Sequence, residues 1–122
     1  MNNPHKNQPG IGHVWRAMAI ARQGFVAAWR CEDAFRQEVL IALVAMPVAL
    51  WFGGSALAKA LLVGSIFAVL IVELLNSALE AAVDHTSLAD HPLAKRAKDI
   101  ASAAVLLSII NAAAIWSLIF LF

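Results

Sequence analysis

The chain has 122 residues, of which 61% are apolar and only 14% are charged. A soluble domain of this size could not bury so much apolar surface, so the composition predicts a membrane protein. The formal net charge of +1 excludes a simple basic nucleic-acid-binding protein. The single cysteine, Cys31, excludes both an intrachain disulfide and a cysteine-based metal site.

The N-terminal third contains two kinds of segment. Residues 1–10 are polar and include a Pro-Gly pair, which predicts a short flexible leader. In residues 11–30, apolar side chains recur at helical spacing, and Arg16, Arg22 and Arg30 interrupt them. This pattern favours an amphipathic helix lying at the membrane surface. An amphipathic helix packed on protein is the alternative.

Three apolar segments follow, and we expect them to be transmembrane helices over about residues 34–52, 57–84 and 97–121 of a single domain. A turn is predicted at Gly53-Gly54-Ser55 between the first two. The polar segment 85–98, which contains Pro92, is predicted to be the only sizeable internal loop. The sequence thus indicates an all-α membrane protein with one surface helix and three spans.

The distribution of basic residues predicts the orientation. Five of the nine precede the first span, three lie in the 85–98 loop, and only Lys59 lies in the first loop. The positive-inside rule therefore places the N-terminus and the 85–98 loop in the cytoplasm and the C-terminus outside. Small residues at 101–104 and 112–114 allow the last span to pack closely and to form oligomers.

The most informative feature is a polar stripe within the second span. On a helix, Glu73, Asn76, Ser77, Glu80 and Asp84 share one face. Charged groups cost free energy in a bilayer, so such a stripe predicts a site for a metal ion, for protons or for a metal–phosphate complex. The alternative is a polar clamp between helices, in which these carboxylates pair with basic residues of the 85–98 segment.

A second acidic cluster lies where the surface helix meets the first span. Asp33 and Arg36 are expected to be solvated charges at the membrane boundary. Glu32 and Glu38 become candidate site residues only if they approach the polar stripe.

A third cluster, Lys95, Arg96, Lys98 and Asp99, precedes the last span. Alone it would anchor the helix at the cytoplasmic face. Beside the stripe it could bind phosphate oxygens while the carboxylates hold Mg²⁺, which prefers hard oxygen ligands.

Three motifs together resemble the prokaryotic diacylglycerol kinase family of small integral-membrane lipid kinases. They read AAW-x-x-E-x-AFRQE at 27–38, VE-x-LNSA-x-EA-x-VD at 72–84 and RAKD-x-x-SAAVL at 96–106. The resemblance runs from about Trp29 to the C-terminus, and the middle motif is highly specific.

The resemblance implies a homotrimer in the inner membrane that transfers the γ-phosphate of MgATP to 1,2-diacylglycerol and yields phosphatidic acid. It implies that Glu73 is the general base and that Glu32 and Glu80 carry Mg²⁺ with the nucleotide. This agrees with the needs of phosphoryl transfer, which are metal-held phosphates, cations and an aligned nucleophile.

The resemblance also implies contacts with each substrate. Besides Glu32 and Glu80, the implied ATP contacts are Asn76, Asp84, Lys98, Asp99 and His13. The implied contacts with the lipid are Trp29, Gln37, Glu38, Glu73, Ser102 and Trp116. His13 and Ile20 stand where enteric family members have arginine and tyrosine, and a neutral histidine contacts phosphate more weakly than arginine. Contacts at Ala89, Asp90 and His91 are implied more weakly.

Three alternatives to a diacylglycerol kinase stay open at the level of sequence. An undecaprenol kinase would use the same machinery on a polyprenol. A small proton-coupled transporter would use Glu73 as the site of proton exchange, and a purely structural oligomer would leave the acidic stripe unexplained.

Overall fold

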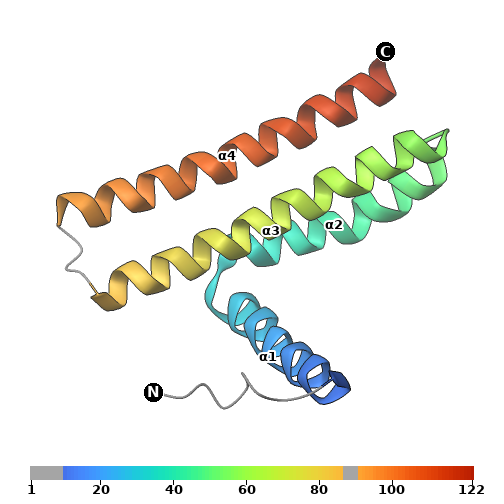
Figure 1. The fold of residues 1–122 in the computed structure, drawn as a ribbon. Coiled ribbons are helices and arrows are strands. Elements are labelled where there is room, and N and C mark those ends of the chain that lie inside the picture. Colours follow the sequence, from blue (N-terminus) through green and yellow to red (C-terminus); the bar gives the residue numbers. More distant parts are fainter. Residues whose placement is uncertain (1–9, 87–90) are drawn as a thin grey trace.

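In this computed structural model, which describes residues 10–86 and 91–122, the described chain forms four α-helices (Figure 1). They are α1 (Gly10–Cys31), α2 (Asp33–Phe52), α3 (Ala56–Thr86) and α4 (Pro92–Leu121). Residues 1–9 of the expected leader lie outside the described residues, and Gly10 already belongs to α1. The all-helical class predicted from the sequence is confirmed.

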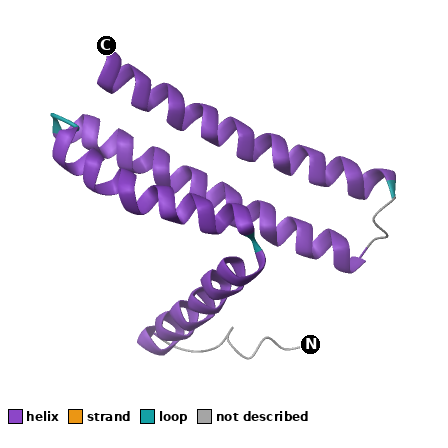
Figure 2. Ribbon diagram, turned by 180° about the vertical axis from the view of Figure 1, so that it is seen from behind, coloured by secondary structure: helices purple, strands orange, loops and turns teal. Residues whose placement is uncertain are grey.

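Three of these helices form a bundle in which α3 packs against both α2 and α4. Figures 1 and 2 show the three running side by side, while α1 leaves the start of α2 at a steep angle. Helices α2, α3 and α4 are long and apolar enough to cross a membrane, so the chain is a membrane protein. Small buried residues at the helix contacts allow close approach. They include Ala28, Ala42, Ala49, Ala94 and Ala101.

The predicted turn between the first two spans is confirmed at residues 53–55. The backbone of Gly54 has φ +84°, a conformation that suits glycine because it has no Cβ. The Gly53 N–H donates to the Ala49 carbonyl at 3.0 Å, and a Cβ on Gly53 would lie 2.5 Å from that same oxygen. Ser55 Oγ accepts a hydrogen bond from the Ala58 N–H at 3.0 Å and caps the start of α3.

The predicted loop at 85–98 was too long, and the predicted start of the last span at 97 was wrong. Helix α3 continues to Thr86, and α4 already begins at Pro92. The Nδ1 atom of His91 accepts from the Leu93 N–H at 3.1 Å and caps the helix. Proline suits the first helical position because the missing N–H would have no helical partner there. The basic residues 95, 96 and 98 therefore lie on a helix.

Helix length determines where the polar residues lie. Helix α2 has 20 residues, whereas α3 has 31 and α4 has 30. At about 1.5 Å per residue, α3 and α4 are about 15 Å longer than α2. Because the 53–55 turn joins α2 and α3 at one end, the extra turns extend beyond the start of α2 (Figure 1). The extension of α3 carries Asn76, Ser77, Glu80 and Asp84 of the polar stripe, and that of α4 carries the basic cluster, whereas Glu73 lies where α2 still covers α3.

Candidate active site

Three glutamates lie around Glu73, which is 3% exposed on α3. Its carboxylate lies close enough to those of Glu32 and Glu80 to be repelled by their charges. Glu38 of α2 experiences the same repulsion from Glu73. We call Glu32, Glu38, Glu73 and Glu80 the glutamate cluster. The condition for including Glu32 and Glu38 in the site, that they approach the stripe, is met.

The glutamate cluster does not stabilise the fold. Grouping carboxylates away from water raises the free energy of their charged forms, through lost hydration and mutual repulsion. One oxygen of Glu38, Oε2, is buried and has no hydrogen-bond partner in the described part of the chain. Buried polar atoms are nearly always satisfied in native structures. The arrangement therefore fits a site that is completed by a ligand.

The neighbouring residues of α3 offer further polar atoms. Asn76 Nδ2 donates to Glu80 Oε1 at 3.3 Å, one helical turn along. The Oδ1 atom of Asn76 and the Oγ atom of Ser77 are buried and, among the described residues, have no partner. The stripe predicted from helical spacing is therefore present as a continuous set of oxygen atoms beside the glutamate cluster.

Arg36 fixes the junction that brings Glu32 to the cluster. Its Nη1 atom donates to the carbonyl oxygens of Trp29 at 2.8 Å and Arg30 at 3.2 Å, and its Nη2 atom pairs with Asp33. An arginine suits this place because the last carbonyls of a helix have no helical partners. As expected for a solvated charge, Asp33 is 83% exposed, whereas Arg36 is 36% exposed and also bonds to the end of α1. Glu32 adopts an extended conformation, φ −120° and ψ 109°, between α1 and α2.

The alternative of a polar clamp between helices holds for one carboxylate of the stripe. Asp84 Oδ1 on α3 pairs with Lys98 Nζ on α4 at 2.5 Å. Asp99 pairs with Lys95 within α4 at 2.6 Å. Within residues 10–86 and 91–122, neither Glu73 nor Glu80 forms an ion pair with a basic side chain. The basic side chains of the described residues thus leave the central glutamates unneutralised.

An apolar groove of about 410 Å³ begins at Glu38 and runs between α2 and α4 over the face of α3. Among the described residues, Glu38 is the only charged one in its lining, and Trp116 also lines it. The remaining lining residues are apolar: Ile41, Ala42, Ala45, Ile66, Val69, Leu70, Ile109, Ala112 and Ala113. A hydrocarbon chain fits such a lining, and Glu38 would lie beside its polar end.

A second hollow, of about 500 Å³, separates α1 from α3. Its polar lining residues are Glu32 and Ser77, and the exposed Cys31 lies beside them. The rest of the lining comes from Ala21, Gly24, Phe25, Ala27, Ala28, Leu74, Ala78 and Ala81. Ser77 is the residue of the stripe that borders this hollow.

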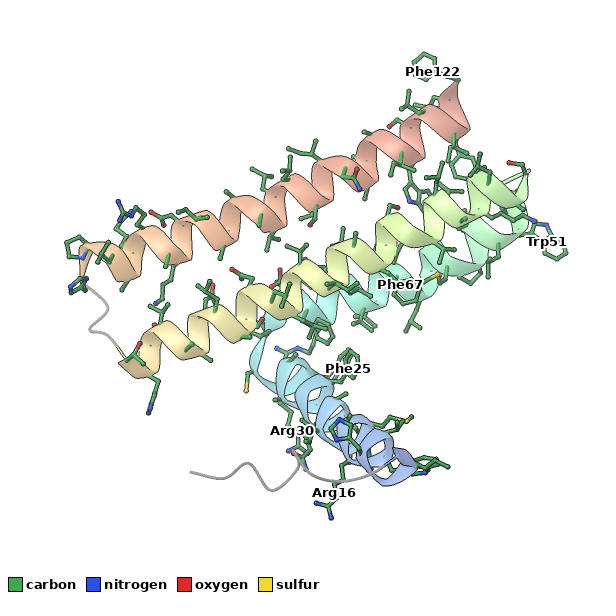
Figure 3. The ribbon with its side chains drawn as sticks, viewed as in Figure 1. Arg16, Phe25, Arg30, Trp51, Phe67 and Phe122 are labelled. Atoms are coloured by element: carbon green, nitrogen blue, oxygen red, sulfur yellow. The ribbon has the colours of Figure 1, made fainter. Side chains whose placement is uncertain are left out.

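Some expected site residues lie apart from the glutamate cluster. His13 is exposed in the first turn of α1, at the end of that helix which points away from α3 and α4 (Figure 1). Gln37 and Ser102 are exposed and do not line the groove, and Trp29 is 42% exposed. Figure 3 shows Trp51 and Phe122 at the opposite end of the bundle from α1. The weakly implied positions 89 and 90 lie outside the described residues.

The oxygen atoms of the site suit a magnesium ion that is shared with substrate phosphates better than a metal ion held by protein ligands alone. Among the described residues, no three side chains of His, Cys, Asp or Glu gather into a metal-binding group. Magnesium usually binds through one or two carboxylates together with substrate phosphates and water. Glu32 and Glu80, whose charges both act on Glu73, supply that number of carboxylates.

Comparisons with known proteins identify the family of the chain. The family described as prokaryotic diacylglycerol kinase matches residues 19–120. The chain is 44% identical to a diacylglycerol kinase of Pseudomonas aeruginosa over 119 residues, which cover 98% of this chain and 97% of that one. It is 42% identical to a diacylglycerol kinase of Escherichia coli over 113 residues, 93% of each chain. A diacylglycerol kinase of Helicobacter pylori is 41% identical over 107 residues, 88% of this chain and 84% of that one.

Proposed function

Because the chain belongs to the prokaryotic diacylglycerol kinase family, we propose that it transfers the γ-phosphate of MgATP to the hydroxyl of 1,2-diacylglycerol. The products are phosphatidic acid and ADP. The observation that carries the proposal is the glutamate cluster at the polar end of the apolar groove. A lipid chain in that groove would bring its hydroxyl beside buried carboxylates. The names of the relatives do not favour undecaprenol or a proton-coupled transporter.

Glu73 is the general base of the proposed reaction. It accepts the proton of the lipid hydroxyl as the hydroxyl oxygen attacks the γ-phosphorus, and the bond from that phosphorus to the bridging oxygen of ADP breaks. Its burial and the absence of a cation partner in the described chain support this role, because a carboxylate removed from water accepts a proton more readily.

Glu32 and Glu80 hold magnesium together with the ATP phosphates. When bound, the ion neutralises the negative charge of the phosphates during transfer. Asn76, Asp84, Lys98 and Asp99 contact the nucleotide. Lys98 pairs with Asp84 in this structure. A phosphate oxygen would either accept a hydrogen bond from Lys98 together with Asp84 or take the place of the Asp84 carboxylate.

The lipid occupies the groove, where Glu38 and Trp116 line the path of an acyl chain. Trp29, Gln37 and Ser102 contact parts of the lipid outside the groove. This division is supported by exposure, because these three side chains are exposed and do not line the groove.

The proposed setting is the inner membrane, with a homotrimer whose N-terminus and α3–α4 connection face the cytoplasm. Helix α1 lies on the cytoplasmic surface, since its exposed Val14, Met18 and Phe25 share one face and would enter the lipid, while Arg16 and Arg30 lie on the other face and would meet headgroups. Exposed apolar side chains on α2 and α4, such as Leu43, Val44 and Leu107, would contact lipid or neighbouring copies.

A mixed-micelle assay tests the proposed function. The purified protein would receive γ-labelled ATP, Mg²⁺ and either diacylglycerol or undecaprenol, and then both lipids together. Label in phosphatidic acid supports the proposal. Label mainly in undecaprenyl phosphate would keep the mechanism and change the acceptor, and no label in either lipid would overturn a lipid kinase.

A further inference from the structure

The groove wall contains one hydrogen bond between helices that the proposed chemistry does not use. The indole Nε1–H of Trp116 on α4 donates to Ser65 Oγ on α3 at 3.0 Å. Ser65 is 2% exposed, and its hydroxyl donates to the Leu62 carbonyl at 2.7 Å. Because the hydroxyl proton points to Leu62, a lone pair of the oxygen is left to accept from the indole.

Inside a bilayer, the hydrogen bond between Trp116 and Ser65 holds the indole ring more firmly than the same bond would in contact with water. An indole N–H inside a bilayer has no solvent partner, so leaving Ser65 would cost it a hydrogen bond. On its own helix, Trp116 also contacts Phe120, with the ring centroids 5.5 Å apart. The ring is therefore held on two sides.

The indole ring of Trp116 lies near the end of the apolar groove that is remote from Glu38. Trp116 and Ile66 line the groove, and Ser65 directly precedes Ile66. Because α2 and α3 are antiparallel, Ala45 and Ile66 mark the end of the groove towards the 53–55 turn. This end lies about 10 Å from Glu38, since seven residues of α2 separate Glu38 from Ala45. A short acyl chain would stop before the indole, whereas a long one would pass it.

We propose that Ser65 is a positioning residue, which holds the Trp116 indole against the far end of the groove and thereby sets the affinity for long-chain lipid acceptors. The inference rests on the proposed function. Ser65 does not touch the reacting atoms, so its loss changes acceptor binding and leaves the chemical step unchanged.

The test compares Ser65→Ala with Ser108→Ala. Ser108 is a matched control because it is 8% exposed and its hydroxyl donates to the carbonyl three residues earlier at 2.7 Å. Within the described chain that bond is its only one.

We expect Ser65→Ala to raise the KM for dioleoylglycerol about threefold, a typical value for a polar contact between membrane helices. The KM for dihexanoylglycerol and the kcat should not change. Ser65→Thr, which keeps the hydroxyl, should resemble the wild type, and Ser108→Ala should leave both KM values unchanged.

Two further measurements separate positioning from general destabilisation. The indole N–H resonance of Trp116, assigned by its absence in Trp116→Phe, should shift in Ser65→Ala and stay in place in Ser108→Ala. In a double-mutant cycle, Ser65→Ala should add nothing to Trp116→Phe, because the donor is already gone.

Four results would overturn the positioning role. They are equal effects of Ser65→Ala on the KM of both lipids, a change in kcat alone, additive effects in the double-mutant cycle, and an unshifted indole resonance. A wild-type protein without kinase activity would overturn the proposed function instead. The indole resonance would then still report whether the bond exists.

Discussion

Lys98 Nζ on α4 lies 2.5 Å from Asp84 Oδ1 on α3, and this ion pair joins the two long helices beyond the start of α2. The side chains are 30% and 57% exposed. A pair this open to solvent contributes at most about 1 kcal/mol to stability. Lys98 can therefore leave Asp84 and bind a ligand with little loss of folding stability.

Replacing Lys98 by Met should raise the KM for MgATP about tenfold or more, because a charged hydrogen bond to phosphate is lost. The unfolding free energy should change little. Lys59→Met, at the opposite end of the bundle, is the matched control and should leave the KM unchanged. Steady-state kinetics with varied MgATP measure the effect, and an unchanged KM in Lys98→Met would exclude the nucleotide contact.

Replacing Glu32 or Glu80 by Gln should raise the Mg²⁺ concentration needed for half-maximal activity about tenfold or more, or should abolish turnover, because a direct ligand is lost. Asp33→Asn is the control, since Asp33 is an exposed neighbour of Glu32 that pairs with Arg36. Titration with Mg²⁺ at fixed ATP distinguishes the variants. A Glu80 variant with the magnesium dependence of the wild type would remove Glu80 as a ligand.

The helices and the stripe could be predicted from the sequence because both are local. Helical spacing places Glu73, Asn76 and Glu80 on one face, and the structure retains that face with a bond between Asn76 and Glu80. The approach of Glu32 and Glu38 to Glu73 could only be stated as a condition. It depends on how α2 packs and on the junction fixed by Arg36, which are tertiary features.

Two features were missed although the sequence contained a signal for one of them. The start of α4 at Pro92 follows from proline at the first helical position and a capping histidine before it, but the polar residues 95–99 indicated a loop. The bond between Ser65 and Trp116 joins residues 51 positions apart. Neither residue predicts the other, because the contact arises only when α3 and α4 pack.

Two glycines should respond in opposite ways to alanine. A Cβ at Gly53 would lie 2.5 Å from the Ala49 carbonyl and 2.7 Å from Lys59 Cγ, so Gly53→Ala should destabilise the protein by about 1–3 kcal/mol. At Gly64, inside α3, a Cβ meets nothing within 4 Å, and Gly64→Ala should stabilise by up to about 1 kcal/mol. Unfolding in detergent micelles measures both, and effects of the same sign would contradict the geometry.

The orientation predicts which residues can be labelled from each side of the membrane. In a Cys31→Ser background, Thr86→Cys should react with an impermeant thiol reagent only in inside-out vesicles. Ser55→Cys, in the opposite connection, should react only in right-side-out vesicles or intact cells. Both side chains are exposed, so the side of the membrane that the reagent reaches decides whether each cysteine is labelled. The reversed pattern would contradict the assignment of the cytoplasmic side.

The account depends most on Glu73, and the most direct measurement is the turnover of Glu73→Gln with MgATP and diacylglycerol. We expect phosphatidic acid formation to fall about 10²–10⁴-fold, the usual contribution of a general base. The variant should unfold at no lower temperature than the wild type, because the substitution removes a repelled, buried charge. A folded Glu73→Gln protein with turnover close to that of the wild type would contradict the assignment of Glu73 as the base.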